Sequence, residues 1–236
     1  MQLPSPKVDS GTLYKLGLYY CAAVSRHPET AALSAPFMEI NTALRAAQRA
    51  REDADLELIP VRVGVQFSEY ELENAIRNTA ITAHRIDGNM RSGPVFDRVF
   101  PNNLHGEVAP RGAAQVVSGQ GLLLRLSTST IAAPVFAEHG EELKSRLETL
   151  KTALAARKQA AEKLALARAQ EWNVREDWVT AYHHNAGIIK SLFPRNSDRQ
   201  NLYFDEFRKS SVSLSVEEDR ELTQLLHPDE SATPAD

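Results

Sequence analysis

The chain has 236 residues, of which 42% are hydrophobic and 25% charged, a composition typical of an ordinary globular protein with one large or two small domains. The formal net charge of -4 gives no long-range attraction for a polyanion, so we expect no nucleic acid among its partners. No apolar run approaches the ~18 residues that span a bilayer, so we expect no membrane association.

The first part of the chain contains the only cysteine, Cys21. It lies in an apolar run over residues 16–24 and has no intrachain partner for a disulfide, so we expect it to pack as a small hydrophobe. The preceding residues include Pro4, Pro6 and Asp9 rather than a basic region leading directly into an apolar one, so an export signal is not expected. Together these features predict a cytoplasmic protein.

A first long helix is predicted from Pro28, a favoured first-turn residue, toward Asp55. Its apolar positions recur at helical spacing and form one stripe: Leu33, Phe37, Ile40 and Leu44. Pro36 is compatible with a helix only in its first turns or at a kink.

Residues 61–67 read Val-Arg-Val-Gly-Val-Gln-Phe, in which apolar and polar side chains alternate. Alternation is the strand pattern, and it is compatible with a short extended segment near 61–67. A further helix is then predicted from Ser68, which would form a capping box with Glu71. That helix is expected to end near Asp87 and Gly88, because glycine adopts the left-handed conformation that closes a helix.

The region around residues 102–127 is the least regular. Residues 102–112 are rich in Gly, Pro and Asn and are interpreted as a connection between repeats. Residues 115–127 carry two glycines between apolar runs and would suit a hairpin, but their match to residues 13–16 favours a helix.

The clearest helix runs from Glu138 to about Trp172, because the segment is rich in Ala, Leu, Glu, Lys, Arg and Gln. Its stripe is Leu143, Leu147, Leu150 and Leu154. Asn173 and Glu176 would form another capping box and open the next helix, which Pro194 should end at Phe193.

The pattern of the first half recurs in the second at an offset of about 110 residues. The offset aligns these residues: Gly11, Leu13, Leu16, Phe37 and Ile40 with Gly121, Leu123, Leu126, Leu147 and Leu150. We therefore predict an all-α protein, an antiparallel bundle of two repeated helical-hairpin units of about 108 residues. The expected division is 1–110 and 111–213, both in one bundle, followed by a C-terminal helix and acidic tail over 214–236.

The segment 193–207 mixes aromatic side chains with arginines, the residue types that dominate binding hot spots. It is a candidate interaction surface through Arg195, Arg199, Tyr203, Phe204 and Phe207. The alternative is that its aromatic rings close one end of the bundle.

A C-terminal helix is predicted where Ser215 and Glu218 form a third capping box. Leu222, Leu225 and Leu226 give it an apolar edge. Because a helix of ~10 residues is unstable alone in water, we expect it to dock on a partner or on the bundle.

Signals for catalysis and metal binding are weak. His183 and His184 are adjacent, so their side chains would point about 100° apart on a helix. Glu69, Glu71 and Glu73 are accounted for by the dipole at a helix start. No phosphate-binding loop, nucleophile elbow or Cys-x-x-Cys pair occurs, and we expect no cofactor and no metal.

The sequence therefore favours a non-catalytic structural or protein-interaction protein that associates with itself as a homo-oligomer or with a protein partner. One alternative is a helical metal-binding protein or enzyme whose site is assembled from scattered residues such as Glu71, His84, His183 and His184. Another is a small-ligand binder with a cavity between the repeats.

Overall fold

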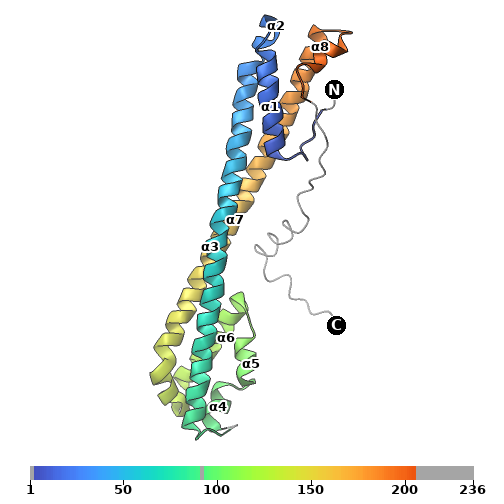
Figure 1. The fold of residues 1–236 in the computed structure, drawn as a ribbon. Coiled ribbons are helices and arrows are strands. Elements are labelled where there is room, and N and C mark those ends of the chain that lie inside the picture. The colour runs from blue at the N-terminus through green and yellow to red at the C-terminus, as the bar shows by residue number, and fades with distance from the viewer. Residues whose placement is uncertain (1–2, 91–92, 206–236) are drawn as a thin grey trace, which may run out of the picture. The chain divides into compact units, whose positions relative to one another are not determined.

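The computed structural model describes residues 3–90 and 93–205. Within these ranges every regular element is a helix, so the predicted all-α class is confirmed (Figure 1). The elements are α1 (Ser10–Val24), α2 (Pro28–Ala31), α3 (Ser34–Ile86), α4 (Pro94–Val99), α5 (Asn103–Val108), α6 (Gly112–Thr128), the 3-10 turn η1 (Thr130–Ala132), α7 (Ala133–Leu192) and α8 (Ser197–Asn201). In this part of the chain, no helix has an apolar stretch that could cross a membrane.

The chain divides into two compact units, and both long helices contribute residues to each. We call them the terminal unit, residues 1–56 and 161–236, and the central unit, residues 57–160. Each unit has its own apolar core. This partition differs from the consecutive repeats 1–110 and 111–213, and the repeat stays a prediction; the predicted segment 214–236 lies outside the described residues.

The terminal unit packs α1 and α2 with the first part of α3, the last part of α7 and α8 (Figure 1). α1 starts after Asp9, whose carboxylate accepts a hydrogen bond from the Thr12 amide. Its inward face supplies Leu13, Leu16 and Tyr20 to the core. Cys21 is buried as predicted, and burial raises the pKa of its thiol.

The central unit packs the rest of α3 and the first part of α7 with α4, α5, α6 and η1 (Figure 1). Asp87 follows α3 and caps α4, because its carboxylate accepts hydrogen bonds from the Val95 and Phe96 amides at 3.1 and 2.7 Å. Gly93 is required beside it, since a Cβ there would lie 2.4 Å from the Asp87 Cγ. Gly88 has φ +70°, the left-handed conformation expected after the helix.

The extended segment near 61–67 is wrong, because these residues lie inside α3. Residues two apart fall on nearly opposite faces of a helix, so alternating apolar residues make a helix apolar on two sides. Val65 is buried, whereas Val63 and Phe67 are exposed. The alternation therefore marks a helix with two apolar faces, and α3 continues through Pro60.

The two capping boxes at Ser68 and Asn173 are also wrong, since both residues lie within continuous helices. The Ser68 hydroxyl instead donates to the Gly64 carbonyl at 2.9 Å, a bond that serine makes in helix interiors. Glu71 pairs with Arg146 at 2.7 Å. The helix continues through these positions because its buried apolar face continues on both sides of them.

Some of the other predicted helix boundaries agree with the structure and some do not. The helix expected from Pro28 is divided into α2 and α3, and the expected connection 102–112 contains α5. Residues 115–127 are helical as favoured, within α6. α7 ends at Leu192, two residues before Pro194, as predicted from the restriction that proline places on its neighbour.

Candidate functional site

The segment 193–205 folds back onto the terminal unit. α8 is capped by Asn196, whose side chain accepts from the Arg199 amide at 3.0 Å. Tyr203 and Phe204 are buried and belong to the apolar core of this unit. Their rings therefore close the core, and an interaction through this segment, which stays a prediction, has to use its exposed side chains.

The two arginines of this segment have different environments. The Arg199 guanidinium lies 3.8 Å from the centre of the Phe193 ring and 3.1 Å from the Glu29 carboxylate. Arg195 is exposed and has a positive φ of 63°. The remaining predicted interaction residues, Phe207, Leu222, Leu225 and Leu226, lie outside the described residues.

An aromatic cluster fills the core of the terminal unit. The ring of Phe37 lies 5.0 Å from Tyr20 and 5.3 Å from Trp178, and Trp178 stacks on Tyr182 at 4.7 Å. Phe204 adds a ring 5.7 Å from Tyr20. Burial raises the pKa of both Tyr20 and Tyr182, so these phenols stay neutral in the folded chain at neutral pH.

One buried amide connects three helices within this cluster. The Asn41 side chain accepts from the Trp178 indole at 2.9 Å and donates to the Tyr14 carbonyl at 3.2 Å. Gly17 of α1 makes room for it, because a Cβ there would lie 2.1 Å from the Asn41 Oδ1. The glycine, amide and indole thus fix how α1, α3 and α7 approach each other.

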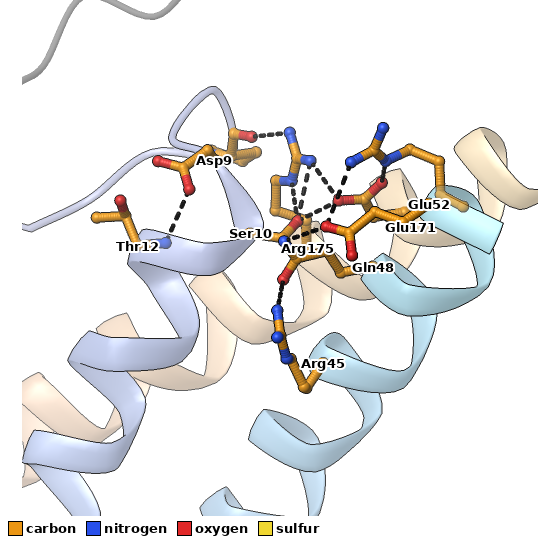
Figure 2. Close-up of polar contacts among 10 residues, drawn as sticks. Asp9, Ser10, Thr12, Arg45, Gln48, Glu52, Glu171 and Arg175 are labelled. Atoms are coloured by element: carbon orange, nitrogen blue, oxygen red, sulfur yellow. Dashed lines mark hydrogen bonds and ion pairs between the residues drawn. The ribbon is translucent and has the colours of Figure 1, made fainter. Parts of the chain in front are cut away.

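A buried ionic network lies at the other end of α1 (Figure 2). Ser10, Glu171 and Arg175 are only 2%, 3% and 5% exposed. The Ser10 hydroxyl donates to Glu171 Oε1 at 2.5 Å, and Arg175 donates to the same oxygen at 3.0 Å. Arg51 of α3 reaches the other carboxylate oxygen at 2.8 Å. One carboxylate of α7 therefore joins the start of α1 to α3.

The network continues along α3 toward the surface (Figure 2). Arg51 lies 3.7 Å from Glu52, and Gln48 donates to Glu52 at 2.8 Å. Arg45 in turn donates to the side-chain amide oxygen of Gln48, Oε1, at 2.8 Å. The buried part is thus connected to solvent through residues of one helix face.

The polar groups of this network satisfy each other. A serine hydroxyl has one proton to donate and two lone pairs. Ser10 gives its proton to Glu171 and accepts two N–H groups of Arg175, at 3.1 and 3.0 Å. The proton and both lone pairs of this hydroxyl are therefore used in contacts that hold α1 and α7 together.

The central unit has two polar clusters of its own, one between α5 and α6 and one between α3 and α7. Buried Glu107 of α5 bonds to Arg125 of α6 and accepts from the Ser118 hydroxyl at 2.6 Å. The Thr82 hydroxyl of α3 lies 2.8 Å from His139 Nε2 of α7. The other ring nitrogen of His139 has no hydrogen-bond partner and lies 3.9 Å from Glu142.

The residues predicted for a scattered metal or catalytic site have separate partners. Glu71 pairs with Arg146, and His84 stacks on Phe96 with 3.9 Å between the ring centres. His183 lies 2.8 Å from the Pro4 carbonyl, and His184 is exposed. Among the described residues, no group of three or more His, Cys, Asp or Glu side chains could hold a metal ion.

The comparisons with known proteins returned no match among protein-family models, curated proteins or solved structures. The buried ionic network was not predicted from the sequence. Its only local signal is the spacing of Glu171 and Arg175, four residues apart on a helix. That spacing is common on exposed faces, so it does not indicate burial.

Proposed function

We propose that this chain is a non-catalytic structural or protein-interaction protein of the cytoplasm that associates with itself. The observation that supports this most is the buried network around Glu171, in which the serine, carboxylate and guanidinium groups are used to hold helices together. Enzymes instead keep such groups available for a substrate. A free, buried cysteine agrees with a reducing compartment.

The predicted duplication of the chain is part of the same proposal. A helix of 15 residues precedes the 53-residue α3, and one of 17 residues precedes the 60-residue α7. Phe96-Asp97 follows the first long helix and Phe204-Asp205 the second. This order supports two copies of one helical unit, each with a shorter helix before a long one.

The test is the state of the full chain after purification. We expect more than one copy per particle, or a protein that co-purifies, when the chain is analysed by sedimentation velocity and mass spectrometry. Elemental analysis should find no transition metal in stoichiometric amount. One metal per chain, lost in His183→Ala or His184→Ala, would instead support the metal-binding alternative.

A second candidate function is hydrolytic catalysis, and it is supported by the pair of Thr82 and His139. A hydroxyl 2.8 Å from an imidazole is the contact by which a base activates a nucleophile, and here Glu142, 3.9 Å from the other ring nitrogen, makes no hydrogen bond to it. Glu138 competes for the same hydroxyl at 3.2 Å. Ester hydrolysis that disappears in both Thr82→Val and His139→Phe would favour this candidate over the first.

A further inference from the structure

Helix α3 is apolar on two opposite faces within the central unit. One face is buried and includes Leu58, Val65, Leu72 and Ile76. The other carries five large apolar side chains that we call the exposed stripe: Ile59, Val63, Phe67, Tyr70 and Ile81, which are 54%, 44%, 65%, 62% and 66% exposed. The alternating sequence 61–67 encodes both faces at once.

The exposed stripe is long and narrow. At about 100° per residue, its five side chains fall within an arc of about 80° directly opposite the buried face. At ~1.5 Å per residue they extend along about 33 Å of helix. An arc narrower than about 100° is the width of a coiled-coil seam, so the shape fits one helix lying along another.

The area of the exposed stripe is large enough for a specific contact. Covering the five side chains would remove roughly 600 Å² from water per copy, against about 800 Å² per partner in a standard interface. The polar residues beside the stripe can supply the rest of the buried area. An area of about 600 Å² is at the upper end of the largest apolar patch on a typical monomer, and patches of that size are often functional.

Asn74 makes the exposed stripe complementary to itself. It is half-buried and lies within the same arc, between Tyr70 and Ile81, where the exposed Arg77 also lies, and its amide both donates and accepts hydrogen bonds. An asparagine in an apolar seam fixes register in two-helix pairs, because it can bond to the same residue of the opposite helix. In a twofold contact the same patch is used by both copies, which is the arrangement that such a residue suits.

Three charged side chains within or beside the exposed stripe, Glu71, Glu73 and Arg77, are paired within the chain. Glu71 pairs with Arg146 at 2.7 Å, and Glu73 lies 2.6 Å from Arg77 and 3.1 Å from Arg111. The hydrogen bond from Arg77 lowers the pKa of Glu73, so this carboxylate stays ionised beside its partners. Two copies can therefore approach along this face without a strip of unpaired negative charge on each.

We propose that the exposed stripe of α3 pairs with the exposed stripe of a second copy of this chain. The inference rests on the proposed self-association and identifies its surface. The second copy is favoured over an unrelated helix because the asparagine, the neutralised flanks and the narrow apolar arc are complementary to themselves.

The experiment compares the full chain with Phe67→Glu and the matched control Leu124→Glu by sedimentation equilibrium. Leu124 lies on α6 of the same unit, outside the stripe, and is 63% exposed, against 65% for Phe67. Because a twofold contact contains the substitution twice, we expect Phe67→Glu to raise the dimer Kd at least about 100-fold. The control should change the Kd by less than about threefold, and circular dichroism should show the same helix content in all three.

Three results would overturn the inference. They are a full chain that stays monomeric at about 100 µM, a dimer whose Kd is unchanged in Phe67→Glu, and a dimer lost only when residues 206–236 are removed. In the second and third cases the proposed self-association stands, through another surface. If Phe67→Glu misfolds, Tyr70→Ser replaces it, with an expected increase of at least about tenfold. A monomer that also co-purifies with no protein would contradict the proposed function itself.

Discussion

Replacing Glu171 by leucine should destabilise the terminal unit strongly, because it leaves two guanidinium groups without their shared carboxylate. Arg175 would keep the Ser10 hydroxyl and the Pro6 carbonyl as hydrogen-bond acceptors and the Trp172 ring as a neighbour, but no anionic partner, while it remains nearly fully buried. Removing one partner of a buried ion pair costs about 3–5 kcal/mol. We expect a loss of that size in the free energy of unfolding for Glu171→Leu.

The same reasoning sets the expectation for a double-mutant cycle. Arg175→Met alone leaves the Glu171 carboxylate with Arg51 and the Ser10 hydroxyl, so we expect it to cost about 3 kcal/mol. Apolar side chains can replace a buried ion pair at little net cost. The double variant Glu171→Leu with Arg175→Met should therefore be no less stable than either single variant, which corresponds to a coupling free energy of at least about 3 kcal/mol.

Urea unfolding followed by tryptophan fluorescence measures these changes in unfolding free energy in the terminal unit. The chain has two tryptophans, Trp172 and Trp178, and both belong to the terminal unit. Two results would refute this reasoning: a cost of less than about 1 kcal/mol for Glu171→Leu, or single effects that simply add in the double variant. Either would mean that the Glu171–Arg175 pair does not contribute to stability as a buried ion pair.

Two further predictions concern the aromatic core of the terminal unit. Gly17→Ala should cost about 1–3 kcal/mol and shift the fluorescence of the core tryptophan, because its Cβ would lie 2.1 Å from Asn41 Oδ1. Gly187→Ala, where a Cβ meets nothing within 4 Å, should instead stabilise by up to about 1 kcal/mol, and equal effects of the two changes would contradict the close approach. Because burial raises the pKa of Tyr20 and Tyr182, the unfolded chain releases these protons first, and stability should fall as the pH rises above their ordinary value of 10.0. Urea midpoints measured between pH 8 and pH 11 should fall less steeply in Tyr182→Phe, and an unchanged slope would exclude this contribution.

The comparison of sequence with structure is most instructive at residues 61–67. The alternation predicts an extended segment, but periodicity over seven residues cannot separate a strand from a helix that is apolar on two sides. The helix forms because the buried residues Leu58, Val65 and Leu72 recur at helical spacing over a longer stretch of α3. The capping boxes at Ser68 and Asn173 do not form for the same reason, since a local signal cannot stop a helix whose buried face continues past it.

The sequence alone determined the all-helical class and several helix ends. Residue composition and apolar spacing act within a few turns, so they predict helices, and the backbone restrictions at Gly88 and Pro194 act on their immediate neighbours. It did not determine which of the two apolar faces of α3 is buried, nor that Glu171 meets Ser10 from a position 161 residues away. Those outcomes were decided by tertiary structure, because a spacing pattern defines a face of a helix but carries no information about the surface that covers it.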